Sequence, residues 1–132
     1  MNSLRIAVLG GTGFIGGSLC ERLVAAGHEV RILTRRRERH REFLVLPSAQ
    51  VIEADVHDPA VLKREFRGLD VVVNLVGILN EPGRDGKGFE RAHAELPAKV
   101  VQACRQSGVA RLLHMSALHA SPEGPSYYLR SK

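Results

Sequence analysis

A glycine-rich stretch close to the N-terminus constrains the fold of this chain more than any other feature of its sequence. It separates an apolar run over residues 4–9 from a helical pattern over residues 14–26, and a second apolar run follows at 29–33. The stretch reads Gly10-Gly11-Thr12-Gly13-Phe14-Ile15-Gly16. A strand, a glycine-rich turn, a helix and a second strand within about thirty residues are typical of a nucleotide-binding βαβ unit.

Three glycines of this turn each have a chemical reason to be there. Gly10 can leave the strand in a conformation that a Cβ would penalise. Gly13 has no side chain that would hold a pyrophosphate away from the backbone, and Gly16 allows the helix to pack closely on the strand. The free amides at the start of the helix then face the phosphates. We therefore expect a dinucleotide site here, and the alternative is an ordinary glycine-rich turn.

Strand-sized apolar runs alternate with helical patterns along the rest of the chain. Strands are predicted at 4–9, 29–33, 50–54, 70–76 and 111–115. Helices are predicted at 14–26, 59–66 and 89–106, with loops at 79–88 and 116–126 and one opening helical turn at 127–132. The first helix is expected to bury Ile15, Leu19 and Leu23 on one face. Such βα units predict one Rossmann-type α/β domain over residues 1–132, a doubly wound parallel sheet with strand order 3-2-1-4-5.

The net charge of +5 and the basic segment 35–41 raise the question of an anionic partner. No aromatic side chains are interleaved with these arginines, so nucleic-acid binding is not expected and a solvated helix start is the simpler interpretation. The sequence has no apolar run long enough to cross a bilayer and no signal-peptide pattern. Cys20 and Cys104 lack metal-ligand spacing, which predicts reduced thiols in a cytoplasmic protein and no metal site.

The residues after the second predicted strand bear on the choice of cofactor. NAD-binding proteins usually place an Asp or Glu there, which accepts hydrogen bonds from the ribose hydroxyls. This chain has Thr34 and Arg35 instead, and the next carboxylate is Glu38. A guanidinium can hold a 2′-phosphate with two parallel charge-assisted hydrogen bonds. NADP(H) is therefore the expected cofactor and NAD(H) the second choice, while the alternative is that Arg35 merely begins the solvated basic segment.

The glycine-rich stretch, together with Tyr128 and Lys132, resembles the short-chain dehydrogenase/reductase superfamily. The glycine spacing is similar to that of its extended and atypical branches, which include NAD-dependent epimerases and dehydratases. Residues 73–79, 114–118 and 128–132 further resemble the NAD(P)H-binding accessory subunit of respiratory complex I and its bacterial homologues. The resemblance covers the whole chain and implies a cofactor-binding Rossmann domain.

The resemblance implies a role for each matching residue. Tyr128 would be the general acid/base, while the Lys132 ammonium would favour its phenolate and hydrogen-bond the ribose. Ser116 would hold the substrate carbonyl, although Ala117 and Leu118 stand where further hydroxyls are found in the family. The implied cofactor contacts are Gly10, Thr12, Gly13, Phe14, Ile15 and Gly16 at the pyrophosphate, Asp55 and Val56 at the adenine, and Leu75, Val76 and Gly77 beside the nicotinamide ribose.

Other interpretations of single residues stay open. Asp55 also suits a turn, and Asn74 on its buried strand also suits a hydrogen bond to neighbouring backbone. His93 stands about where many family members have an Asn, and we expect it, like His114, to be packed or solvated rather than chemically active.

Two functions are compatible with these patterns. The first is hydride transfer to or from a carbonyl or alcohol of an unidentified small-molecule substrate. The second is a non-catalytic role as a cofactor-binding structural or assembly factor of a respiratory complex, or as a redox sensor. The chain ends at Lys132, so the C-terminal part of the family fold is expected to be missing, and an uncovered fifth strand is expected to promote self-association through residues 111–116.

Overall fold

The computed structural model of the protein describes residues 2–11, 14–35, 47–78 and 83–132. Its centre is a five-stranded sheet in the order β3-β2-β1-β4-β5, with all neighbouring strands parallel. The strands are β1 (Arg5–Leu9), β2 (Glu29–Thr34), β3 (Ala49–Glu53), β4 (Val71–Asn74) and β5 (Arg111–His114). The predicted fold class and strand order are confirmed. Thr12, Gly13 and the basic residues 36–41 lie outside the described residues.

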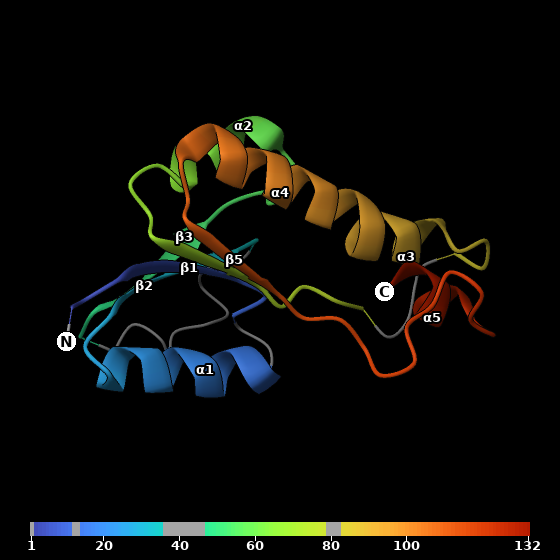
Figure 1. Cartoon of the computed structure of the whole chain (residues 1–132), viewed down its shortest axis with the longest axis horizontal. Helices are drawn as coiled ribbons and strands as arrows, with labels where there is room; N and C mark the ends of the chain where they lie inside the picture. The colour runs from blue at the N-terminus through green and yellow to red at the C-terminus, as the bar shows by residue number, and fades with distance from the viewer. Residues whose placement is uncertain (1, 12–13, 36–46, 79–82) are drawn as a thin grey trace.

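Helices cover both faces of the sheet (Figure 1). Helix α1 (Phe14–Ala25) lies on one face, and α2 (Pro59–Glu65) and α4 (Leu96–Ser107) lie on the other. Because side chains alternate along a strand, Ile6 and Val8 of β1 pack on the α1 side, while Ala7 and Leu9 pack on the side of α2 and α4. All four residues of β4 are buried, as expected of a central parallel strand.

Local sequence signals set the ends of two helices. Oδ1 of Asp58 accepts a hydrogen bond from the N–H of Ala60 at 3.0 Å, and Pro59 occupies the first turn of α2. Gly108 follows α4 in a left-handed conformation with φ 73°. The strand bounds differ by one or two residues from those that the apolar runs predict, which is the usual uncertainty of element ends.

The helix predicted from 89 to 106 begins earlier and is not uniform. α3 (Lys87–Glu90) starts at Lys87, so the predicted loop 79–88 is wrong at its C-terminal end. The next five residues form a π-helical turn, η3 (Arg91–Glu95), in which the N–H of Leu96 donates to the carbonyl oxygen of Arg91. Pro97 lies at the start of α4, directly after this π-helical turn, where the hydrogen-bond register of the helix changes.

The buried face of α1 differs from the sequence pattern in the first turn. Ile15 is 54% exposed, and the fully buried positions are Gly16 and Cys20. The turn that precedes α1 touches the helix at Gly16, so the contact row runs from Gly16 to Cys20 and Ile15 faces outward. Cys20 and Cys104 are free and buried, and burial raises the pKa of Cys20 to about 11.

Candidate functional site

The loops that follow β1 and β4 meet at the carboxyl edge of the sheet, and a glycine allows the contact. Gly10 has a left-handed backbone with φ 76°, and a Cβ there would lie 2.9 Å from the carbonyl carbon of Leu75 and from the nitrogen of Val76. The N–H of Leu75 donates to the carbonyl oxygen of Leu9 at 2.8 Å, which extends the pairing of the two central strands to this point. Any side chain at position 10 would therefore separate the two loops.

Helix α1 approaches the same turn closely. A Cβ on Gly16 would lie 2.5 Å from the carbonyl oxygen of Gly10 and from the Cα of Gly11. The close packing expected of Gly16 is thus present, with the turn itself as the neighbour. Phe14 and Ile15 stand at the start of the helix with 95% and 54% of their surface exposed.

A pocket of about 190 Å³ opens beside this junction, at the carboxyl ends of β1 to β4. It brings together five residues to which the sequence assigns cofactor contacts: Gly10, Thr34, Arg35, Val56 and Val76. Leu33, Ala54 and His57 also line it. None of the described lining residues is a carboxylate. Residues from four separate loops therefore form one concave surface.

His57 lines this pocket and lies under the influence of three cations and one carboxylate. Burial is the largest effect that lowers the pKa of its imidazole, and three cations contribute in the same direction: Arg91, Lys99 and Arg35. Asp55 acts in the opposite direction. Within the described structure the buried Nδ1 of His57 has no hydrogen-bond partner. The balance of charges is positive, which fits the phosphate-bearing adenosine end of a dinucleotide.

Asp55 has the turn role that the sequence left open. Its Oδ1 accepts a hydrogen bond from the N–H of His57 at 3.0 Å. The residue is exposed and directly precedes Val56 in the pocket lining. Contact of Asp55 and Val56 with an adenine ring stays a prediction.

Asn74 shapes the end of β4 and joins it to β5. Its Oδ1 accepts a hydrogen bond from the N–H of Val76 at 3.1 Å, and its Nδ2 lies 3.2 Å from Nδ1 of His114. An amide nitrogen only donates, so Nδ1 of His114 accepts and the ring is neutral. Burial lowers the pKa of His114, and Lys132 lowers it further. Asn74 thus makes the hydrogen bond to neighbouring backbone that the sequence suggests for it.

A second group of residues gathers around helix α5 (Tyr127–Ser131), beyond the carboxyl ends of β4 and β5 (Figure 1). Nζ of Lys132 donates to the carbonyl oxygen of Met115 at 3.2 Å and to that of Val76 at 3.5 Å. Oγ of Ser116 donates to the main-chain oxygen of Lys132 at 3.2 Å. Burial lowers the pKa of the Lys132 ammonium. Ser116 and Lys132 therefore lie together, next to the loop that follows β4.

Tyr128 is held through its ring. The ring centroid lies 5.3 Å from that of His93 at an angle of 87°, and 6.0 Å from that of Phe89 at 82°. The rings of Phe89 and His93 are stacked with centroids 5.8 Å apart. We call these three residues the aromatic cluster; it connects α3, η3 and α5.

His93 is packed, as the sequence predicts, but its hydrogen bonds also make it a candidate positioning residue, a role that the sequence did not suggest. It is 4% exposed, its Nε2 accepts a hydrogen bond from the N–H of Ile78 at 2.9 Å, and its Nδ1 lies 3.0 Å from Oγ of Ser131. Burial lowers the pKa of His93 to about 4, with contributions from Lys132 and His114. The only available signal was its place in the family pattern, where many members have an Asn. For His57 the signal was its position directly after Asp55 and Val56.

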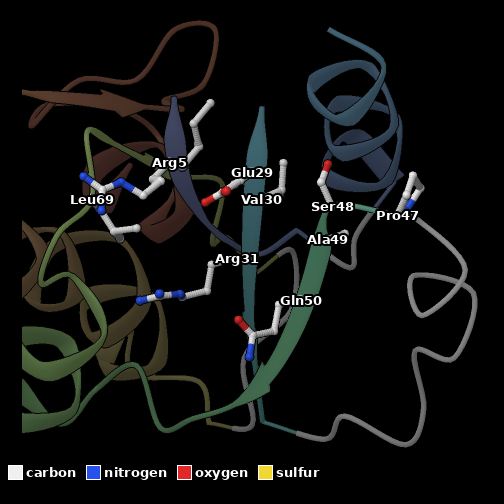
Figure 2. A pocket seen from close by; sticks show the side chains of 10 residues that line it. Arg5, Glu29, Val30, Arg31, Pro47, Ser48, Ala49, Gln50 and Leu69 are labelled. Atoms are coloured by element: carbon white, nitrogen blue, oxygen red, sulfur yellow. The ribbon is translucent and has the colours of Figure 1, made fainter. Parts of the chain in front are cut away.

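A larger concavity of about 340 Å³ lies at the opposite, amino-terminal edge of the sheet, as Figure 2 shows. Arg5 and Arg31 extend into it from neighbouring strands, and each has a carboxylate nearby. Nε of Arg5 lies 3.8 Å from Oδ2 of Asp70, and Nη1 of Arg31 lies 3.9 Å from Oε2 of Glu65. Ligands of open α/β sheets bind beyond the carboxyl ends of the strands. The candidate site is therefore the smaller pocket together with the neighbouring α5 region.

In the part of the chain that the structure describes, no group of three or more His, Cys, Asp or Glu side chains could hold a metal ion. The helices of this same part are too short or too polar to cross a bilayer.

Open α/β sheets of this strand order, with a glycine turn at their carboxyl edge, bind nucleotides, and this domain is of that class. Over residues 6–128 the sequence matches the NAD dependent epimerase/dehydratase family, and the chain belongs to that family. The superfamily resemblance that the motifs indicated is thus confirmed.

Several curated relatives are about one third identical to this chain over the aligned residues. It is 31% identical to ceramide reductase of Caulobacter vibrioides over 127 aligned residues, and the alignment covers 96% of this chain and 39% of that protein. It is 31% identical over 130 residues to the Mus musculus protein NADH dehydrogenase (ubiquinone) 1 alpha subcomplex subunit 9, mitochondrial, covering 95% and 34% respectively. With 2-alkyl-3-oxoalkanoate reductase of Stenotrophomonas maltophilia the identity is 32% over 113 residues, covering 86% and 33%. The chain thus spans 33% to 39% of the length of these relatives.

Solved structures share the fold. The UDP-Glc/GlcNAc 4-epimerase from Campylobacter jejuni superposes with a TM-score of 0.85 at 20% identity, covering 99% of this chain and 46% of that one. The Bordetella bronchiseptica enzyme WbmG, solved in complex with NAD and UDP, superposes with a TM-score of 0.77 at 26% identity, covering 90% and 39%. The first likeness shows the fold alone, whereas the second comes from a protein whose structure holds NAD.

Proposed function

We propose that residues 1–132 form the cofactor-binding domain of an NADP(H)-dependent oxidoreductase. The observation that carries the preference for NADP(H) is the pocket at the carboxyl edge: Arg35 lines it directly after β2, and none of its described lining residues is a carboxylate. A planar guanidinium suits a 2′-phosphate because it can form two parallel charge-assisted hydrogen bonds. A cytoplasmic location belongs to the same proposal and is supported by the buried free thiols of Cys20 and Cys104.

The positive surroundings of His57 support this assignment. Arg35, Arg91 and Lys99 all act on its imidazole, and Nζ of Lys99 donates to the carbonyl oxygen of His57 at 3.0 Å. Cations from three separate segments therefore act on a residue that lines the pocket, against one carboxylate, Asp55. A 2′-phosphate would supply the matching anionic charge.

The test is to measure dissociation constants for NADPH and NADH, at fixed salt, with the wild type and with Arg35→Ala. Charge-assisted hydrogen bonds contribute roughly 1.5–3 kcal/mol each, so one such bond predicts an about ten- to hundredfold preference for NADPH that the variant loses. Arg105→Ala removes the same charge from an exposed position on α4 and serves as the control. Equal wild-type affinities, or a ratio unchanged in Arg35→Ala, would contradict the proposal.

The proposed reaction is the reduction of a carbonyl group or its reverse, in which a bound nicotinamide supplies or accepts the hydride. Tyr128 exchanges a proton with the substrate oxygen, and Ser116 donates a hydrogen bond to that oxygen. The Lys132 ammonium hydrogen-bonds the ribose of the bound cofactor. The position of Ser116 beside Lys132 and the placement of Tyr128 and Lys132 four residues apart at α5 support these roles. To donate to a substrate, the Ser116 hydroxyl turns away from the main-chain oxygen of Lys132. The relative named 2-alkyl-3-oxoalkanoate reductase supports a carbonyl compound as the substrate class.

A second candidate is a cofactor-binding subunit of a respiratory complex that performs no chemistry. The observation that favours it is the 31% identity to the mouse subunit over 95% of this chain. NADPH oxidation with a panel of ketones and quinones, measured on the full-length protein and on Tyr128→Phe, separates the two candidates. Turnover that the variant loses supports the oxidoreductase, while tight NADPH binding without turnover supports the accessory subunit.

A further inference from the structure

His93 is buried between the loop that follows β4 and helix α5, and both of its ring nitrogens are engaged. Its Nε2 accepts a hydrogen bond from the N–H of Ile78 at 2.9 Å, and its Nδ1 lies 3.0 Å from Oγ of Ser131. Only 4% of the residue is exposed. Both nitrogens of this buried imidazole have hydrogen-bond partners, so burying the ring leaves no polar atom unpaired.

The direction of every hydrogen bond in this chain of groups is fixed. A backbone N–H only donates, so Nε2 of His93 carries no proton and the proton is on Nδ1. Oγ of Ser131 lies 3.0 Å from the carbonyl oxygen of Tyr128, which only accepts, so the hydroxyl proton is used there. Oγ of Ser131 must then accept from Nδ1–H of His93. The sequence of donors runs from Ile78 through His93 and Ser131 to the backbone of Tyr128.

The imidazole of His93 also contacts the side chain of Tyr128, the proposed general acid/base. The imidazole ring of His93 meets the ring of Tyr128 edge to face, with the ring centroids 5.3 Å apart. The ring of Phe89 stacks on the same imidazole, with the centroids 5.8 Å apart. One residue therefore holds both the backbone and the ring of Tyr128. It does so from the π-helical turn η3, where the helix is wider than a regular α-helix.

Helix α5 depends on such contacts because it has only five residues. Isolated helices of this length do not persist in water, since one hydrogen-bonded turn does not offset the entropy of fixing it. Ser126 caps its start by accepting a hydrogen bond from the N–H of Leu129 at 3.1 Å. His93 reaches its other end through Ser131. The two ends of α5 are thus held separately. At the end nearer Lys132, His93 acts together with the hydrogen bonds that Lys132 makes to Met115, Val76 and Ser116.

We propose that His93 is a positioning residue. Its neutral imidazole ties Ile78, which directly follows Leu75, Val76 and Gly77, to Ser131 in α5, and this link helps to set the place of Tyr128 and Lys132. The hydrogen-bond chain stands on the geometry alone. Its consequence for turnover rests on the function proposed above. A cationic ring would break the chain, because protonated Nε2 cannot accept from Ile78.

The first test uses the whole chain without cofactor. Long-range ¹H–¹⁵N spectra should show His93 as the neutral Nδ1–H tautomer at neutral pH. His93→Phe keeps the aromatic contacts but removes both hydrogen bonds, and amide exchange at Ile78 should accelerate about tenfold or more. Ser131→Ala should leave Ile78 protected and accelerate the amides of Arg130 and Lys132 by a similar factor, while Ser131→Thr should restore their protection.

His28→Phe is the matched control, because Nδ1 of His28 also accepts a backbone hydrogen bond, from Leu4 at 3.0 Å, but at the amino edge of the sheet. It should leave Ile78 and α5 unchanged. An Nε2–H tautomer or a cationic ring at neutral pH would overturn the proposal, and so would unchanged exchange at α5 in Ser131→Ala. These measurements need no nucleotide, so they remain decisive if the NADP(H) assignment fails.

The second test uses turnover of the full-length protein. Misplacement of Tyr128 predicts that Ser131→Ala lowers kcat about tenfold or more while KM for NADPH stays within about twofold, and that Ser131→Thr recovers kcat. A wild-type kcat in Ser131→Ala would overturn the positioning role. An increase in KM alone would also overturn it, because it would place Ser131 in cofactor binding instead.

Discussion

The missing side chain of Gly77 leaves room for the ammonium group of Lys132. A Cβ on Gly77 would lie 2.9 Å from Nζ of Lys132. That ammonium donates to the carbonyl oxygen of Met115 at 3.2 Å and to that of Val76 at 3.5 Å. One cation thus joins the loops after β4 and β5 to the end of α5, and the contact requires a glycine.

Gly77→Ala is expected to weaken cofactor binding without unfolding the protein. The new Cβ displaces only the end of a flexible side chain, so the free energy of unfolding should change by less than about 0.5 kcal/mol. The displaced ammonium loses its proposed ribose contact, which predicts an about tenfold weaker affinity for NADPH. Calorimetric titration and denaturant unfolding measure the two quantities. An unchanged affinity would contradict the assignment of Lys132.

Gly16→Ala is expected to destabilise the fold itself. Its Cβ would meet backbone atoms of Gly10 and Gly11 at 2.5 Å, and backbone cannot rotate away. Overpacking of this kind costs about 1–3 kcal/mol. Gly83→Ala is the control, because its nearest contact would be the Asp85 side chain at 3.5 Å. Urea unfolding should separate the two variants, and equal midpoints would show that α1 can move off the turn without penalty.

Acid is expected to destabilise the protein through His93. Burial, with help from Lys132 and His114, lowers the pKa of His93 from 6.5 to about 4. Between these values the unfolded chain binds a proton that the folded chain does not, so stability is complete above pH 6.5 and is lost as the pH falls toward 4. His93→Phe should reduce the loss of unfolding free energy between about pH 7 and about pH 4.5 by about 2 kcal/mol. The same slope in wild type and variant would show that His93 does not cause it.

The edge strand β5 is expected to promote self-association. It pairs with β4 on one side, and exposed apolar side chains lie on it and just beyond it: Leu113 at 52%, Met115 at 41% and Leu118 at 84%. An apolar edge offers unpaired backbone groups to a second copy. Sedimentation at rising concentration should show dimers or larger species, which Leu113→Lys should suppress. Leu4→Lys places the same charge at the amino edge as a control, and a wild type that stays monomeric would refute the expectation.

The sequence predicted the helices and strands well where the signal was local, and less well where it depended on packing. Asp58 with Pro59, and Gly108, marked helix ends because their effects act within one turn. Ile15 was misassigned to the buried face, since the helical pattern does not include the contact of Gly16 with the preceding turn. The helix start at Lys87 was missed because Gly86 and Gly88 on either side of it suggested a loop.

The sequence by itself determined the alternation of strands and helices, the strand order and the edge of the sheet that carries the site. Those features follow from hydrophobic periodicity and from glycine spacing, and both can be read within short segments of the sequence. The tertiary structure decided the states of individual side chains. His93 is neutral because it is buried and its Nε2 accepts from the N–H of Ile78, and Arg35 shares a pocket with Val76 from another strand. Desolvation and hydrogen-bond partners come from segments far apart in the chain, and no local pattern encodes which of them will meet.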